Sequence, residues 1–266
     1  MKKDLARQLK LKKCYKNSQM NRFGRGFLGL PPVTKNIIMI NVLMLLASYA
    51  ATSVFGVDLN GILGLYFPKS EHFMPIQIIT HMFMHGGFWH IFFNMYALFI
   101  FGVVLENVWG PKRYFIFYIV CGLGAALTHE SVIAIQYTHL IKSISPENIQ
   151  LVLNEGSAYF NLGKLFTDPD MQNLQLLLNT PTVGASGAIF GVLLAFGVLF
   201  PNTQLMLLFP PIPIKAKYFV MFYGALELYL AVTAPGSNIA HAAHLGGMLF
   251  GYLLIRYWRK TTNTLY

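Results

Sequence analysis

Six long runs of apolar residues divide the chain, and short segments that are polar or contain Pro and Gly separate them. A transmembrane helix needs about 20 mainly apolar residues, and somewhat fewer where neighbouring helices cover its ends. The pattern therefore predicts six transmembrane helices. They are expected at Asn36–Val57, Trp89–Val108, Tyr114–Thr128, Val183–Phe200, Tyr218–Val232 and Ile239–Tyr257.

Composition favours a membrane protein over a soluble one. Of 266 residues, 55% are hydrophobic and 11% are charged, which is too little charge to cover a soluble domain of this length. Cys14 lies in a basic segment and Cys121 in an apolar one, so a disulfide between them is not expected. The expected fold class is all-α, a polytopic helical bundle held by the bilayer and by helix packing.

The placement of charge predicts the topology. Nine Lys and Arg residues but only one acid, Asp4, precede residue 26. Beside a hydrophobic segment, such a tail favours a cytoplasmic N-terminus next to anionic lipid over nucleic-acid binding. Six spans then put both termini in the cytoplasm of a multi-pass cell-membrane protein. The remaining basic clusters all fall on the same side: Lys112/Arg113, Lys215/Lys217 and Arg256/Arg259/Lys260.

A polar insertion interrupts the membrane domain between the third and fourth spans. Residues 130–181 carry five acids against two lysines, and we expect them outside, with short amphipathic helices near Glu147–Leu153 and Met171–Leu178. The insertion either affects substrate access or forms a passive cap. The expected organisation is a basic tail, a membrane domain containing the insertion, and a short cytoplasmic tail, at residues 1–35, 36–258 and 259–266.

The fourth span opens with Gly184-x-Ser186-Gly187. Taken alone this pattern is weak, because small residues are common where transmembrane helices touch, and a serine can simply hydrogen-bond within its helix. The sixth span opens with His241 and His244. An intramembrane histidine is costly without a partner, so it is a functional candidate, with helix–helix hydrogen bonding or metal ligation as alternatives.

The predicted topology brings these two segments together. Ser186 and His244 each lie early in a span that enters from the outside, so both are expected at a similar depth near the external surface. Small-residue stripes allow the two helices to approach closely; their members are Gly187, Gly191, Gly247 and Gly251. A hydroxyl and an imidazole at hydrogen-bond distance form an activated nucleophile pair.

A third polar segment lies at the external end of the second span. His90 and Asn94 are four residues apart and share one helix face. Both can donate hydrogen bonds to a developing oxyanion, beside the backbone N–H of Ser186. For His81 and His85 we favour a structural role in ordering the loop.

No acid has an obvious place beside His244. Glu227 lies within the fifth span, and the sequence assigns it no role. A Ser186–His244 dyad is therefore simpler than a triad. Phe190, one turn after Ser186, is expected to orient the imidazole by packing.

Together these segments resemble the rhomboid intramembrane serine proteases. The resemblance rests on Gly184-x-Ser186-Gly187, on Ala243-His244-x-x-Gly247-x-x-x-Gly251, and on His90-x-x-x-Asn94. Gly102-x-x-x-Glu106-x-x-x-Gly110 also looks like a family motif, in which the Glu is structural. The resemblance implies a six-helix bundle, and a Ser186–His244 dyad with an oxyanion site at His90 and Asn94 that is open to the external side. It also implies cleavage of transmembrane protein substrates in or near their membrane segments, without a cofactor or metal.

The sequence departs from the family pattern in its first external loop and beside the dyad. Ile76-Gln77 stands near the place of a typical Trp-Arg pair, and Phe190 stands where many members carry Tyr. Two other readings remain. One is a proteolytically inactive rhomboid-like protein that binds membrane clients, although such proteins usually lack the Ser or the His. The other is a His-rich metal or haem membrane protein, which leaves the Gly-x-Ser-Gly context unexplained.

Overall fold

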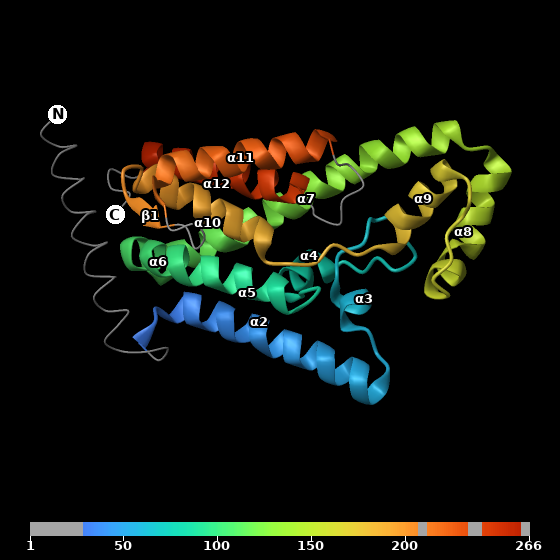
Figure 1. Cartoon of the computed structure of the whole chain (residues 1–266), viewed down its shortest axis with the longest axis horizontal. Coiled ribbons are helices and arrows are strands. Elements are labelled where there is room, and N and C mark those ends of the chain that lie inside the picture. Colours follow the sequence, from blue (N-terminus) through green and yellow to red (C-terminus); the bar gives the residue numbers. More distant parts are fainter. Residues whose placement is uncertain (1–28, 207–211, 234–240, 262–266) are drawn as a thin grey trace, which may run out of the picture.

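The computed structural model describes residues 29–206, 212–233 and 241–261 (Figure 1). The basic N-terminal segment, the predicted start of the sixth span at Ile239 and the last residues of the C-terminal tail lie outside these ranges. The elements, in chain order, are α2 (Pro32–Ala50), η2 (Ala51–Phe55), α3 (Leu59–Leu63), α4 (Gln77–Thr80), η3 (His81–Phe83), α5 (Phe88–Ala97), η4 (Leu98–Gly102), α6 (Val103–Trp109), α7 (Pro111–Ser143), α8 (Pro146–Asn161), α9 (Pro169–Asn179), α10 (Ser186–Leu199), β1 (Gln204–Met206), β2 (Pro213–Lys215), α11 (Ala216–Thr233) and α12 (His241–Thr261).

Six helical segments of the described residues make up the bundle. Three continuous runs within the described ranges are long and apolar enough to cross a membrane, namely Pro32–Phe55, Phe88–Trp109 and α7. Their outer faces carry large apolar side chains, such as Leu46 and Phe93, which are 57% and 55% exposed. An apolar surface of this kind suits contact with lipid. The shorter apolar helix α10, together with α11 and α12, completes the bundle.

Helix α10 lies at the centre of the bundle, against α7 and α12 (Figure 1). Most of its side chains are buried, including Val192 and Phe196. Tyr114, Phe117 and Tyr118 of α7 are fully buried in the same core. Since other helices surround α10, its 14 residues need not span the bilayer alone.

Helix α7 continues well beyond Thr128, the predicted end of the third span. At about 1.5 Å per residue its 33 residues measure about 50 Å, against a hydrocarbon core of about 30 Å. The polar residues from His129 onward end the apolar run but not the helix, because they include neither Gly nor Pro. Helix α7 ends shortly before Pro146, as the restriction on residues that precede a proline predicts.

The insertion folds into two helices at the far end of α7, away from the bundle (Figure 1). Helices α8 and α9 are both longer than the short segments expected from the sequence. They enclose a second apolar core with the end of α7 and the loop before α4. Its buried members are Phe67, Ile144, Val152, Met171, Leu174 and Leu178.

A small hairpin departs from a purely helical fold. Strands β1 and β2 pair antiparallel, with Gln204 opposite Lys215, and they lie between α10 and α11, where the sequence predicted only one of the short Pro-containing segments that separate the spans.

Candidate active site

Ser186 occupies the first position of α10, at the end of an ordered loop. The preceding residues are fixed by backbone hydrogen bonds, because Gly184 donates to the His81 carbonyl at 2.9 Å and Thr182 pairs with Leu65. The first N–H groups of a helix have no partner within that helix. The hydroxyl of Ser186 therefore lies beside backbone donors that suit a developing negative charge.

His244 lies in the first turn of α12 and meets Ser186 directly. Its Nε2 atom is 2.8 Å from the Ser186 Oγ atom, and the residue is 7% exposed. Phe190 stacks on the ring with centroids 4.1 Å apart and planes 8° from parallel. The structure thus brings together the two residues proposed as the catalytic pair, with the aromatic side chain expected to orient the base.

Glycines set the distance between α10 and α12. A methyl group on Gly247 would overlap the carbonyl group of Gly187, and one on Gly191 would lie 2.9 Å from the Gly247 oxygen and overlap Cys121. A methyl group on Gly251 would come within 3.4 Å of the Gly191 Cα atom. The two backbones touch where the sequence predicted small-residue stripes, because no side chain separates them.

His90 faces Ser186 across Gly184. Gly184 has a φ of 130°, and a methyl group there would lie 2.9 Å from His90 Nε2 and 3.7 Å from Ser186 Oγ. Only glycine suits both this backbone conformation and this space. The Asn94 side-chain nitrogen donates to the His90 carbonyl at 2.9 Å, which leaves its second hydrogen available.

His81 and His85 are buried in the loop that precedes α5. His81 Nδ1 lies 2.8 Å from the Gln77 carbonyl oxygen, so it orders the loop. Burial and the neighbouring His90, whose ring centroid is 5.0 Å away, lower the pKa of His85 to about 4. His85 is therefore neutral at physiological pH and packs beside the proposed oxyanion residue.

Glu227 of α11 was the residue whose role the sequence did not predict. Its Oε2 atom is 3.0 Å from His244 Nδ1 and 2.6 Å from His241 Nδ1. All three side chains are buried. Only the fact that an acid lies within an apolar run could have drawn attention to Glu227. The three residues also have potential metal-ligand atoms within 4.8 Å of one another.

Glu106 lies at the other end of the second span and contacts α2. Its carboxylate accepts hydrogen bonds from the backbone N–H groups of Val33 and Thr34 at 2.9 and 2.7 Å, and from the Thr34 hydroxyl at 2.8 Å. The N-cap residue of α2, Pro31, provides no side-chain cap of its own. Glu106 thus caps another helix, which is the contact of a structural anchor.

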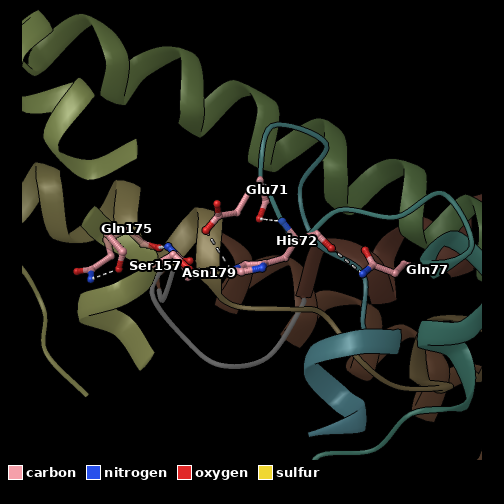
Figure 2. A network of polar contacts seen from close by, with 8 residues as sticks. Glu71, His72, Gln77, Ser157, Gln175 and Asn179 are labelled. Carbon is pink, nitrogen blue, oxygen red and sulfur yellow. Dashed lines mark hydrogen bonds and ion pairs between the residues drawn. The ribbon is translucent and has the colours of Figure 1, made fainter. Parts of the chain in front are cut away.

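Gln77, near the place where the sequence lacks the expected Trp-Arg pair, organises the first loop. It is fully buried, and its amide nitrogen donates to the carbonyls of Ile62 and His72 at 3.0 and 2.9 Å. Figure 2 shows this network extending toward the insertion, where His72 Nε2 is 3.0 Å from the Ser157 hydroxyl of α8. This chain lacks the Trp-Arg pair, and polar contacts inside the protein hold its first loop instead.

The fold and the site together define a helical membrane protein with a partly buried serine–histidine pair. Residues 72–261 match the Rhomboid domain, and the chain belongs to the rhomboid family. This match confirms the family resemblance and the six-helix bundle that it implies.

Named relatives come from mitochondria and bacteria. The chain is 29% identical over 189 residues to Rhomboid protein 1, mitochondrial, of Saccharomyces cerevisiae, 28% over 178 residues to the putative rhomboid protease YdcA of Bacillus subtilis, and 26% over 180 residues to the rhomboid protease AarA of Providencia stuartii. These matches cover 71%, 67% and 65% of this chain, and 43%, 64% and 52% of the relatives. The chain therefore spans less than two thirds of each relative's length.

Proposed function

We propose that this protein is an intramembrane serine endopeptidase that cleaves transmembrane proteins in or near their membrane segments. The observation that carries the proposal is the 2.8 Å contact between Ser186 Oγ and His244 Nε2, made at the N-terminus of a buried helix. A nucleophile and a base within hydrogen-bond reach, with the base oriented by a third group, are the signature of nucleophilic catalysis.

The proposed reaction begins with attack of Ser186 on a peptide carbonyl. As the Oγ–C bond forms, the hydroxyl proton passes to His244 Nε2 and the carbonyl π electrons move to oxygen. We propose that the Ser186 backbone N–H, His90 and Asn94 stabilise this oxyanion by hydrogen bonding. His244 then gives its proton to the amine as the C–N bond breaks.

Water completes the cycle by hydrolysing the acyl-enzyme. His244 accepts a proton from water as its oxygen attacks the ester carbonyl, and it returns that proton to Ser186 as the C–O bond breaks. This step needs an aqueous path to the site. Ser186 and His244 each lie near the start of their helices, which supports access from one membrane surface, and we propose that this is the external one. Both termini would then be cytoplasmic.

The test is cleavage of a model single-pass membrane protein by the purified full-length chain in detergent, beside Ser186→Ala and His244→Ala. We expect cleavage by the wild type alone, and slow fluorophosphonate labelling at Ser186. Cleavage that persists in Ser186→Ala would exclude the proposed nucleophile. Binding of the substrate without cleavage by the wild type would instead support an inactive, client-binding rhomboid protein.

No metal or cofactor takes part in the proposed reaction. Activity should therefore be unchanged by EDTA, and loss of activity on chelation with recovery on adding zinc would contradict this mechanism.

A further inference from the structure

A buried carboxylate lies behind the proposed base, on a helix that the Ser186–His244 pair does not involve. Glu227 is carried by α11, and its Oε2 atom contacts the Nδ1 atoms of His241 and His244 at 2.6 and 3.0 Å. Glu227 is 7% exposed. A charge buried to this degree is costly unless partners compensate it. His241 Nδ1 is in hydrogen-bond contact with the carboxylate, and His244 Nδ1 lies near enough to add to that compensation.

The contact with Glu227 selects one tautomer of His244. A carboxylate accepts hydrogen bonds, so it favours a proton on the His244 Nδ1 atom. The Nε2 atom is then free of hydrogen and can accept the proton of Ser186 Oγ, 2.8 Å away. The opposite tautomer would place an N–H against the hydroxyl and could not act as a base.

We propose that Glu227 is the positioning residue of this site, completing a Ser186–His244–Glu227 relay in which His241 holds the carboxylate in place. Glu227 keeps His244 in the productive tautomer and stabilises the imidazolium that forms when Ser186 is deprotonated. Glu227 itself stays ionised throughout, as in other serine protease triads. The inference rests on the proposed protease function.

His241 and His244 contact Glu227 differently and have different roles. His241 makes the shorter contact, with hydrogen-bond geometry, and fixes the carboxylate between α11 and α12. His244 Nδ1 has no aligned hydrogen-bond acceptor within the described residues, although Glu227 lies 3.0 Å away. Catalytic hydrogen bonds are often poorly aligned before substrate binds and tighten in the complex. His244 thus keeps the freedom to move between serine and leaving group, while Phe190 restrains its plane.

A metal ion bound by the same three residues would have the opposite effect. It would take the lone pairs of both Nδ1 atoms, since a ligating histidine nitrogen must be deprotonated. His244 Nε2 would then carry the proton, and the contact with Ser186 Oγ could not serve general-base catalysis. The relay and a resident metal therefore predict different tautomers of the same ring.

The kinetic test compares Glu227→Gln with wild type, using the full-length protein in detergent and a model transmembrane substrate. Glu227→Gln should lower kcat by about 10²–10⁴-fold, the range expected when the acid of a triad becomes an amide, with KM changed less than about threefold. Glu227→Asp should recover part of that loss. Glu106→Gln, the same change at a buried carboxylate distant from His244, is the matched control and should keep kcat within about threefold below its melting temperature.

The second measurement does not depend on turnover or on the identity of the substrate. Nitrogen-15 NMR of histidine-labelled protein in Ser186→Ala and Ser186→Ala/Glu227→Gln forms reports which nitrogen of His244 carries the proton. We expect Nδ1–H while the carboxylate is present and Nε2–H once the amide replaces it. A wild type that never cleaves would refute the proposed function, while the tautomer would still test the relay.

Three results would overturn the inference. One is a Glu227→Gln protein whose kcat stays within about threefold of wild type. Another is the same His244 tautomer with and without the carboxylate. The third is one equivalent of zinc in the purified wild type that is lost in His241→Ala.

Discussion

The capping of α2 by Glu106 allows a quantitative test of how the bundle is held together. Replacing Glu106 with Gln keeps the size and shape of the side chain but removes its charge. One carboxylate oxygen accepts from the Val33 N–H, and the other accepts from both the N–H and the hydroxyl of Thr34. Glutamine has a single acceptor oxygen, and its amide group must face one of these donors.

These contacts give the magnitude. If the Gln oxygen keeps the two contacts with Thr34, the contact with Val33 is lost and an N–H is left opposite another N–H, which costs about 1–3 kcal/mol. The two remaining bonds weaken because a charged acceptor makes roughly twice as strong a bond as a neutral one. The negative charge at a helix N-terminus contributes about 0.3–2 kcal/mol more. Recovered solvation offsets part of this total, so we expect a net loss of about 3 kcal/mol in the free energy of unfolding.

The assay is equilibrium unfolding in mixed detergent micelles, followed by circular dichroism. The matched control is Glu130→Gln, because both carboxylate oxygens of Glu130 are buried without a hydrogen-bond partner among the described residues. That change should be neutral or stabilising. A loss below about 1 kcal/mol for Glu106→Gln, or an equal loss for Glu130→Gln, would refute the capping role. The losses in free energy of unfolding caused by Thr34→Val and by Glu106→Gln should not add up in the double variant, because the two side chains contact each other.

Three further changes test the site and the loop beside it. Gly247→Ala should separate α12 from the Gly187 carbonyl, costing about 1–3 kcal/mol of stability and most of the cleavage rate. At the control position, Gly156, an added methyl group meets only ordinary contacts, so Gly156→Ala should leave stability and cleavage rate nearly unchanged. Phe190→Ala should lower kcat about 10-fold or more by releasing the His244 ring, whereas Phe190→Tyr, which retains the stacking, should not; equal rates for the two variants would contradict the stacking role. Because burial and His90 lower the pKa of His85 to about 4, the folded state resists protonation of this ring. Up to about 3 kcal/mol of the free energy of unfolding should therefore be lost as pH falls from about 6.5 to 4. In unfolding measured against pH, His85→Gln should flatten this loss, and an unchanged pH dependence of stability would assign the loss to other groups.

Hydropathy was enough to predict the helical membrane fold, and topology was enough to predict that Ser186 and His244 lie near each other. Both residues begin spans that enter from the same side, so their depth follows from the order of the helices. The glycine stripes then indicated which faces meet. These inferences depend on chain order and residue size, which can be read directly from a sequence.

The role of Glu227 could not be predicted in the same way. Helix α11 is apolar on most sides, so the sequence does not indicate which face it turns toward α12. The contact with His241 and His244 depends on that rotation, which packing determines. How far α7 extends beyond Thr128 could not be predicted either, because polar residues end an apolar run without ending a helix. Its apolar residues Ile133 and Tyr137 pack on the insertion core, and only the tertiary structure shows that partner.

The backbone contact between Gly187 and Gly247 has a consequence for how this protein can change over generations. The spacing of the Ser186–His244 pair depends on a few positions that accept no side chain, whereas lipid-facing positions need only remain apolar. Most of the membrane domain can therefore change in sequence without moving the two reacting groups. An identity of 26–29% with named relatives is the divergence expected when so little of a sequence fixes the geometry. A mutational scan should accordingly show sharp intolerance at the α10–α12 glycines and broad tolerance on the outer faces of α2 and α5.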